Sequence, residues 1–344
     1  MDSFGAPVAG LTLWPGGRAD RFGGMNGPGF GFDPTYGYDL DRLLAVGAPA
    51  EPAGFAAFWR ERYAAALAVD PDPVLGPVED KRDGCRVLGV TFSSVGGVRL
   101  GGWVVLPDEE PARHGFVVGH GYGGRATAGL PLPLSRAAAI QPCVRGLPDR
   151  GRIPGIPDTS DEHVLHGIET PETYVLAGCV ADLWCAATAL RQLVPELDDR
   201  LGYLGQSLGG GLGALALPWD DRFAAAQLTV PTFGNQPLRL TLECAGSGES
   251  VRRYARRHPE VTEVLAYFDA ASAARRITVP TLVGAALLDP SVPPPGQFAV
   301  HNALVGPKQL AVLTAGHVDR PGLAAENAAL AAATARFCTT HLAT

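Results

Sequence analysis

The sequence predicts an α/β fold with a mostly parallel central sheet and helices on both of its faces. From about residue 115 onward, short apolar runs alternate with longer helical stretches, which is the arrangement that places parallel strands between helices. The composition, 46% hydrophobic and 18% charged, supplies enough apolar material for a large core. We therefore expect one main domain, over residues 51–344 of the 344-residue chain.

Residues 1–50 differ from the rest because they are rich in glycine and proline. This composition favours turns and irregular structure, so we expect an N-terminal arm that lies on the surface or at a subunit contact. The following segment, residues 53–68, has apolar side chains at helical spacing, among them Phe55, Phe58 and Trp59. It predicts an amphipathic helix.

The sheet is expected to begin with an antiparallel hairpin within residues 85–106, because two β-type segments flank Gly96-Gly97. Further apolar runs predict strands at 115–119, 137–144, 201–206, 224–230, 280–286 and 309–314. Helices are expected over roughly 172–194, 208–217, 296–304 and 322–340. Polar, glycine-containing and basic sequence interrupts this alternation at about 235–268 and predicts a helical insertion near the site.

Charge and composition exclude several classes of partner. The net charge of -7 argues against nucleic acid, since its binders concentrate Lys and Arg on one face. The N-terminus lacks the basic and apolar regions of a signal peptide, and no apolar run approaches the length of a membrane span. Six cysteines are too few for a disulfide scaffold in a chain of this length. We expect a soluble cytoplasmic protein that contacts neither nucleic acid nor membrane.

A candidate nucleophile stands in the segment from Gly205 to Gly209, where Ser207 is at the centre of a G-x-S-x-G pattern. An apolar strand precedes the pattern and an Ala/Leu-rich helix follows it, the context of the nucleophile turn in the α/β-hydrolase fold. The glycines are needed because the turn is sharp and lifts the serine above the sheet. A glycine-rich turn with an incidental serine is the alternative, and only suitable partner residues can decide between the two.

Two later residues can complete a catalytic triad with Ser207. Asp289 ends an apolar strand and is followed by Pro290, and His317 follows the next expected strand. In this fold the acid and then the histidine follow the serine along the chain, and the carboxyl ends of parallel strands share one edge of the sheet. We predict that His317 is the general base and that Asp289 orients it.

The glycine-rich segment around Tyr122 follows an early strand, the position from which hydrolases supply one donor of the oxyanion hole. We assign the two donors to the backbone N–H groups of Tyr122 and Leu208. A phosphate-cradling loop is disfavoured because the segment lacks a Lys-Ser/Thr ending.

A metal site is suggested only by Asp161, Glu162, His163 and His166, whose two histidines stand three residues apart. A metallohydrolase needs more ligands at defined spacing. We therefore expect neither a metal nor any other cofactor.

These motifs together resemble the acetyl xylan esterase and cephalosporin C deacetylase family, carbohydrate esterase family 7, over about residues 55–340. The likeness includes Gly121 to Arg125, Arg145-Gly146, the serine motif, and the segments that carry Asp289 and His317. It implies deacetylation of acetylated sugars or related small acetyl esters, a cytoplasmic setting, and a homo-oligomer, often a hexamer.

The chain departs from the family pattern at Leu147, Leu208 and Val318, where the family usually has glutamine, glutamine and glutamate. Backbone donation by Leu208 survives the change of side chain, but we expect an altered pocket polarity. The sequence thus predicts a carboxylic ester hydrolase that cleaves small acyl esters through an acyl-serine intermediate. A carboxylesterase, lactonase or peptidase, or a non-catalytic binding module of the same fold, are the alternatives.

Overall fold

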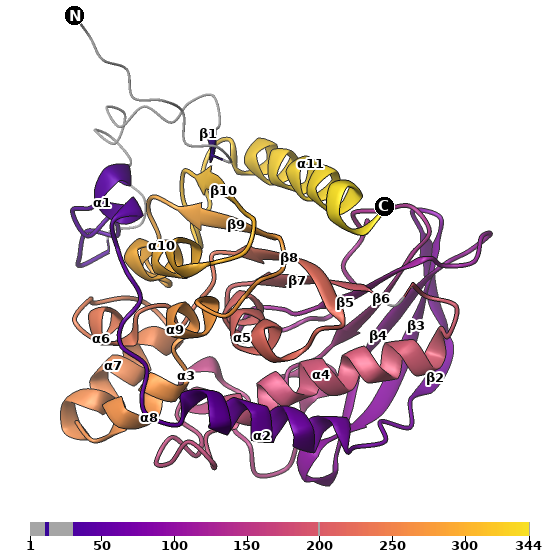
Figure 1. Ribbon diagram of the computed structural model, residues 1–344, viewed down its shortest axis with the longest axis horizontal. Helices are drawn as coiled ribbons and strands as arrows, with labels where there is room; N and C mark the ends of the chain where they lie inside the picture. Colours follow the sequence, from indigo (N-terminus) through magenta and orange to yellow (C-terminus); the bar gives the residue numbers. More distant parts are fainter. Residues whose placement is uncertain (1–10, 14–29, 199, 344) are drawn as a thin grey trace, which may run out of the picture.

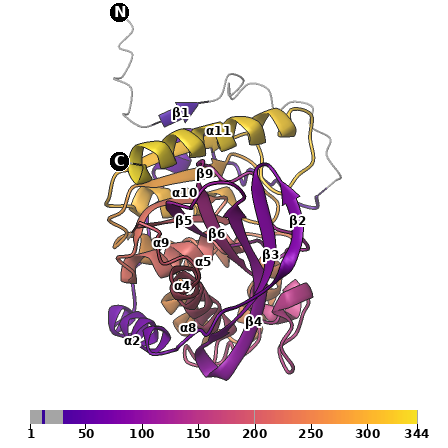
Figure 2. The same ribbon diagram turned by 90° about the vertical axis from the view of Figure 1, so that its right-hand side faces the viewer.

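The computed structural model describes residues 11–13, 30–198 and 200–343, and in it a twisted sheet runs through the molecule between layers of helices (Figures 1 and 2). The strands are β1 (Leu11–Leu13), β2 (Val74–Arg82), β3 (Cys85–Ser94), β4 (Val98–Pro107), β5 (His114–Val118), β6 (Ala137–Pro142), β7 (Leu201–Gln206), β8 (Phe223–Thr229), β9 (Thr281–Ala286) and β10 (Lys308–Leu313). The α-helices are α1 (Leu40–Leu44), α2 (Phe55–Leu67), α3 (Ser160–His163), α4 (Val175–Leu193), α5 (Leu208–Ala216), α6 (Gln236–Arg239), α7 (Ser247–Arg257), α8 (Val261–Tyr267), α9 (Ala270–Ala274), α10 (Pro294–Ala303) and α11 (Leu323–Leu342).

The strand order of the described sheet is β1-β10-β9-β8-β7-β5-β6-β4-β3-β2. Every pair from β1 to β6 in this order is parallel, and the pairs from β6 to β2 are antiparallel. The predicted fold class, a mostly parallel sheet of the α/β-hydrolase kind, is confirmed. All predicted strands and long helices are present, with ends that differ by a few residues.

Alternate side chains of the parallel strands enter two separate cores, because successive residues of a strand point to opposite faces. Ala226 and Val283 belong to the large core under α2, α4, α5, α9 and α10, whereas their neighbours Ala225 and Leu282 belong to a smaller core that includes Leu330 of α11. Figure 2 shows α11 on the opposite side of the sheet from α4 and α5. The prediction of helices on both faces is confirmed.

The hairpin expected within residues 85–106 is formed by β3 and β4, which turn at Gly96 and Gly97. The structure adds β2, which the sequence analysis did not predict. This strand is the sheet edge and is exposed along almost its whole length. It therefore lacks the apolar alternation that marks a half-buried strand, and it contains Pro77, which is tolerated at edges.

The large core contains the aromatic side chains that the helix over residues 53–68 was expected to bury. Trp59 of α2 and Trp184 of α4 are completely buried and meet edge to face, with ring centroids 6.3 Å apart. Such aromatic pairs stabilise a fold by about 0.5–1.5 kcal/mol beyond the contribution of the apolar area that they bury. This contact fixes α2 against α4, on the sheet face that also carries α5.

The insertion at about 235–268 forms α6, α7 and α8 between β8 and β9, and α7 contacts α3. The segment N-terminal to α2 also packs on the domain: Leu43 of α1 is fully buried, and the Pro34 carbonyl accepts a hydrogen bond from the Asp289 backbone at 3.1 Å. Residues 1–10 and 14–29 of the expected arm over residues 1–50 lie outside the described residues. Its boundary near residue 50 stays a prediction.

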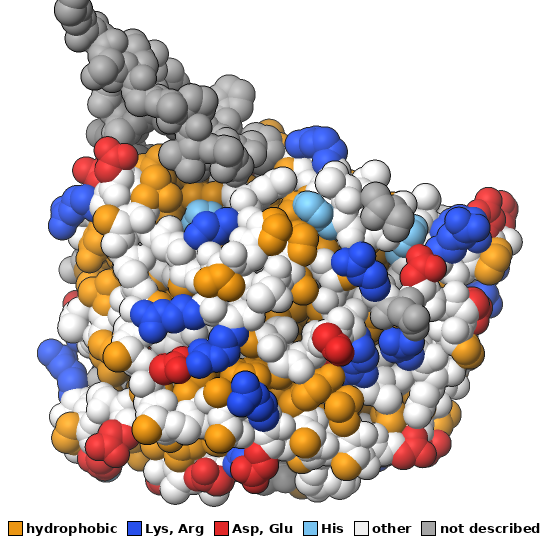
Figure 3. All heavy atoms as spheres, viewed as in Figure 1, with side chains coloured by type: hydrophobic (Ala, Val, Ile, Leu, Met, Phe, Trp, Pro, Cys, Tyr) orange, Lys and Arg blue, Asp and Glu red, His pale blue; other side chains and the backbone are white. Residues whose placement is uncertain are grey.

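No described helix combines the length and the apolar character needed to cross a bilayer. The face in Figure 3 carries basic and acidic side chains scattered among apolar ones, with Lys and Arg over its middle and acidic side chains mostly along its lower edge.

Candidate active site

Ser207 occupies the turn between β7 and α5 in a backbone conformation that L-residues rarely adopt, with φ 54° and ψ -115°. Such a conformation costs about 1–3 kcal/mol and persists only where surrounding contacts fix it. Here the Ser207 N–H donates to the Thr229 carbonyl at 2.9 Å, and the Ser207 carbonyl accepts from the Thr232 N–H at 3.2 Å. The neighbouring strand β8 thus holds the turn.

The two glycines of the predicted motif are required by close backbone contacts. A Cβ on Gly205 would lie 2.5 Å from the Gly209 carbonyl oxygen, and a Cβ on Gly209 would lie 2.7 Å from the Gly119 carbonyl carbon. Neither contact can be relieved by moving a flexible side chain. The motif is therefore a packed strand-to-helix turn, as expected from the sequence.

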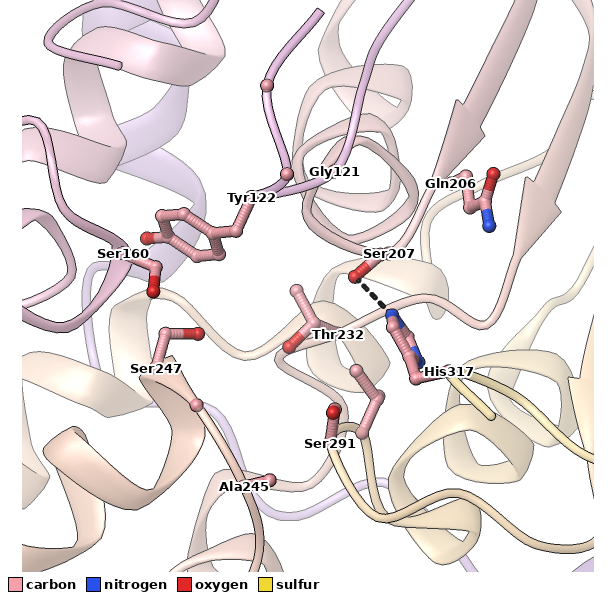
Figure 4. A pocket seen from close by; sticks show the side chains of 14 residues that line it. Gly121, Tyr122, Ser160, Gln206, Ser207, Thr232, Ala245, Ser247, Ser291 and His317 are labelled. Carbon is pink, nitrogen blue, oxygen red and sulfur yellow. Dashed lines mark hydrogen bonds between the residues drawn. The ribbon is translucent and has the colours of Figure 1, made fainter. Parts of the chain in front are cut away.

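The structure brings together all three side chains predicted from sequence order. His317 Nε2 lies 3.0 Å from Ser207 Oγ, drawn as the dashed line in Figure 4, and His317 Nδ1 lies 2.8 Å from Asp289 Oδ2. Ser207 follows β7, Asp289 follows β9 and His317 follows β10, so all three stand at the carboxyl edge of the sheet. The carboxylate is fully buried, while the imidazole is 25% exposed.

The pKa of His317 is set by two opposing effects. Burial disfavours the imidazolium and lowers the pKa, whereas the hydrogen bond with Asp289 and the negative charge of that carboxylate raise it. The pKa lies above its ordinary value of 6.5. The imidazole is consequently a stronger base than a free histidine and can take a proton from Ser207.

The carboxylate of Asp289 receives three further hydrogen bonds. Oδ1 accepts from the backbone N–H groups of Ser291 at 2.9 Å and Val292 at 3.0 Å. Oδ2, which faces His317, also accepts from Gln297 Nε2 at 2.9 Å. The sequence analysis missed Gln297, since one amide in an apolar helix carries no distinctive pattern.

The loop after β5, which carries Tyr122, approaches Ser207 closely at Gly121. A Cβ on Gly121 would lie 3.4 Å from Ser207 Cβ, so the loop passes directly over the nucleophile. Leu208 is the first residue of α5, where a backbone N–H has no acceptor within the helix. The assignment of the oxyanion donors to the N–H groups of Tyr122 and Leu208 stays a prediction.

His120 anchors this loop to the sheet. Its Nδ1 donates to the Gly121 carbonyl at 2.7 Å and its Nε2 accepts from the Val144 N–H at 2.9 Å. Burial lowers the pKa of His120 to about 4, so the ring is neutral and keeps both bonds at neutral pH.

The Tyr122 side chain is held by His163, one of the residues considered for a metal site. Tyr122 donates its hydroxyl proton to His163 Nδ1 at 3.3 Å, and His163 Nε2 donates to the Arg145 carbonyl at 2.8 Å. Burial lowers the pKa of His163 to about 4. Both ring nitrogens of this histidine therefore have protein partners.

Arg145 continues the same network with an ion pair inside the domain. Its guanidinium donates to both carboxylate oxygens of Asp182 in α4, at 2.8 and 2.5 Å, and Ser94 donates to the same carboxylate. The Arg145 side chain is 11% exposed and the Asp182 side chain 3% exposed. Removing one partner of such a pair would leave an uncompensated buried charge. The ion pair therefore holds Arg145 in place, and the Arg145 carbonyl in turn accepts the hydrogen bond from His163.

A cavity of about 370 Å³ opens in front of Ser207. Figure 4 shows hydroxyl-bearing side chains around it, with Tyr122, Ser160 and Ser247 on one side and Ser207 and His317 on the other. Its lining consists of Gly121, Tyr122, Gly123, Gly124, Ser160, Gln206, Ser207, Thr232, Ala245, Gly246, Ser247, Ser291, Val292 and His317. The loops after several strands and the start of α7 thus build one small pocket with both polar and apolar lining.

None of the three departures from the family pattern, Leu147, Leu208 and Val318, is among these lining residues. Leu147 and Leu208 are fully buried in the large core. Their side chains can influence the pocket through packing, so the expected change in pocket polarity is not located at these two positions.

The parallel sheet, the nucleophile turn after β7 and the adjoining histidine and carboxylate define an α/β-hydrolase with a serine-type site. The chain belongs to the acetyl xylan esterase family (AXE1), whose sequence pattern matches residues 39–331. This is a family of carboxylic ester hydrolases.

Solved structures and a curated relative agree with this membership. The acetyl xylan esterase from Paenibacillus sp. R4 is 26% identical, with a TM-score of 0.72 over 89% of this chain and 100% of its own. Acetyl Xylan Esterase 1 from Thermoanaerobacterium sp. JW/SL YS485, at 22% identity, has the same fold, with a TM-score of 0.74 over 88% of this chain and 99% of its own. Acetyl esterase Axe7A of Xylanibacter ruminicola is 25% identical over 153 residues, which span 44% of this chain and only 35% of that protein.

Proposed function

We propose that this chain is a serine esterase that removes acetyl groups from small esters, with acetylated sugars as the substrate class. The observation that carries the proposal is the continuous set of contacts from Ser207 Oγ through His317 to the buried Asp289, beside a small cavity. Family membership and the names of the similar proteins support the same reaction.

In the first half-reaction, Ser207 Oγ attacks the ester carbonyl while its proton passes to His317 Nε2. Asp289 accepts the hydrogen bond from Nδ1 and stabilises the imidazolium that forms. The tetrahedral intermediate then expels the alcohol, which takes the proton from Nε2. An acetyl-serine ester remains.

The negative charge on the carbonyl oxygen develops next to the Tyr122 and Leu208 N–H groups, to which we assign the oxyanion hole. Loss of one such donor costs about 3–4 kcal/mol in a studied hydrolase. The amino end of α5, which begins at the nucleophile, adds a favourable dipole.

Water completes the cycle in the second half-reaction. His317 Nε2 removes one proton from the attacking water, the tetrahedral intermediate collapses, and that proton passes to Ser207 Oγ as acetic acid leaves and ionises in solution. The same neutral imidazole is therefore required in both halves.

The pocket supports a small, polar substrate. A volume of about 370 Å³ is near the lower end of the range for small-molecule sites, about 300–1,000 Å³. Its serine and threonine hydroxyls can both donate to and accept from the hydroxyl groups of a sugar. A volume of this size leaves little room for a long acyl chain.

We further propose a cytoplasmic enzyme that forms a homo-oligomer, with a hexamer as the expected state. The family resemblance supports the assembly, and the free thiols of all six cysteines, which lie within the described ranges, suit a reducing compartment. Light scattering after gel filtration measures the oligomer directly.

The test of the proposed function is a hydrolysis series with p-nitrophenyl esters from acetate to octanoate, together with acetylated xylosides and cephalosporin C. We expect kcat/KM to be highest for acetate and to fall as the acyl chain lengthens. Ser207→Ala provides the matched control, since it removes only the Oγ atom. Preference for the longer esters, or equal rates with Ser207→Ala, would contradict the proposal.

A further inference from the structure

Gln297, in the first half of α10, directly contacts the carboxylate that faces His317. Its Nε2 donates to Asp289 Oδ2 at 2.9 Å, and the same carboxylate oxygen is 2.8 Å from His317 Nδ1. Gln297 is completely buried. Its amide group therefore acts on Asp289 without competition from solvent.

The orientation of this amide is fixed by its other partners. Gln297 Oε1 accepts from the Ala286 N–H at the end of β9 at 2.8 Å, and Nε2 also donates to the Val292 carbonyl at 2.6 Å. A rotated amide would place its N–H₂ group against the Ala286 N–H and its oxygen against a carbonyl and a carboxylate. Only the observed orientation satisfies every group.

The side chain thus ties the start of the Asp289 loop, through Ala286, to its far end, through Val292. The Val292 N–H in turn donates to Asp289 Oδ1 at 3.0 Å. Since both carboxylate oxygens are held, the plane of the carboxylate cannot rotate freely, and Oδ2 remains directed at His317.

We propose that Gln297 is a positioning residue of the hydrolytic site, which holds the Asp289 carboxylate in the orientation that receives His317 Nδ1. This inference rests on the proposed function, because it assigns Gln297 to the same reaction. Gln297 acts through Asp289 and does not line the substrate cavity described above.

Loss of the amide donor has a predictable electrostatic consequence. A carboxylate with one donor fewer is less stabilised by its surroundings and interacts more strongly with the imidazolium of His317. Among the described residues, the Asp289 charge also acts on Tyr36 and Cys244, and burial raises the pKa of both, so they remain neutral in the relevant pH range. The pH dependence of His317 should therefore report on Gln297.

The decisive variant is Gln297→Met, which keeps the side-chain length but has no strong donor. We expect kcat/KM for p-nitrophenyl acetate to fall about tenfold, the scale of one hydrogen bond to a charged group, and the fall of activity with acidification to begin at higher pH. In the Asp289→Asn variant, the additional change Gln297→Met should lower kcat/KM little further. Gln297→Glu, which preserves the shape and the Oε1 acceptor, should move the pH dependence in the same direction if Gln297→Met does not fold.

Asn302→Leu is the matched control, because Asn302 is an amide on the same helix that donates only to the Leu43 and Val46 carbonyls. It should lower the melting temperature without moving the pH profile. The proposal is overturned if the pH dependence of a folded Gln297 variant equals that of the wild type. It is also overturned if the loss of kcat/KM in the double variant equals the product of the losses caused by Gln297→Met and Asp289→Asn alone. An NMR titration of the His317 ring gives the same readout without turnover, so failure of the proposed function remains distinguishable from failure of this inference.

Discussion

His317 lines the cavity in front of Ser207, whereas His163 is completely buried behind the lining residue Tyr122, and the two histidines differ in what their Nδ1 atoms contact. Nδ1 of His317 meets the carboxylate of Asp289, and Nδ1 of His163 meets the hydroxyl of Tyr122. Burial lowers the pKa of both rings. The carboxylate more than offsets burial at His317, whereas the pKa of His163 falls to about 4.

In this site, a buried histidine is a base only where a carboxylate accepts a hydrogen bond from its other nitrogen. His163 is neutral at all physiological pH values, and both of its nitrogens are engaged with Tyr122 and the Arg145 carbonyl. It can position the loop that contains Tyr122. Nε2 of His317 contacts the Ser207 hydroxyl and Nδ1 contacts the Asp289 carboxylate. The ring can therefore take up and release a proton during each cycle.

Replacement of each histidine by glutamine tests this division of roles most severely. His317→Gln should lower kcat/KM for p-nitrophenyl acetate by about 10⁶-fold, as for triad residues of a studied protease. His163→Gln can preserve both hydrogen bonds of His163, so it should change kcat/KM by about tenfold or less. Steady-state kinetics at neutral pH measures both, and losses of equal size would remove the distinction.

Asp289→Asn should convert His317 into a histidine that resembles His163, with a neutral partner and no compensation for burial. We expect kcat to fall by about 10⁴-fold with a much smaller change in KM, because the amide favours the wrong tautomer of the ring. Single-turnover and steady-state rates can be compared with those of the wild type. An Asn variant that retains most of the rate would show that His317 needs no carboxylate.

The pH dependence of kcat/KM tests how the Asp289 carboxylate sets the pKa of His317. Because His317 must be neutral to accept the serine proton, kcat/KM should rise with pH through the pKa of this ring, with an apparent pKa above 6.5 in the wild type. The residual activity of Asp289→Asn should show a midpoint at lower pH, since burial then acts alone. A wild-type midpoint well below 6.5 would mean that burial dominates at His317.

Acid stability gives the smallest predicted effect and concerns His163. Its pKa is lower in the folded protein than in the unfolded chain, so the unfolded state binds one more proton between about pH 6.5 and 4. The resulting stability is fully present above pH 6.5 and decreases by about 1.4 kcal/mol per pH unit on acidification. Denaturant titrations of His163→Gln should show a pH dependence that is shallower by one proton than that of the wild type, and an identical slope would contradict this account.

The sequence predicted the fold and the positions of Ser207, Asp289 and His317, because each follows an apolar strand and strand ends of a parallel sheet converge. It did not predict contacts that depend on the packing of distant segments. The Pro34 carbonyl meets the Asp289 backbone across 255 positions of the chain, and no local pattern encodes that. Gln297 is closer in sequence, yet its role depends on how the loop after β9 folds back on α10.

Two further features that the sequence did not predict, the strand β2 and the role of His163, have similar physical causes. β2 escaped prediction because an exposed edge strand needs little apolar alternation, and the role of His163 was hidden because its partners, Arg145 and Tyr122, come from two other loops. Patterns report burial and local geometry, whereas these contacts arise only after the sheet has brought the loops together.

The most direct test of the account is covalent labelling with an organophosphonate, followed by mass spectrometry of the peptides. The account predicts one phosphonyl group per chain, attached to Ser207, and formed much more slowly in His317→Gln at the same probe concentration. Efficient labelling at another residue, or none in a preparation that hydrolyses p-nitrophenyl acetate, would contradict it.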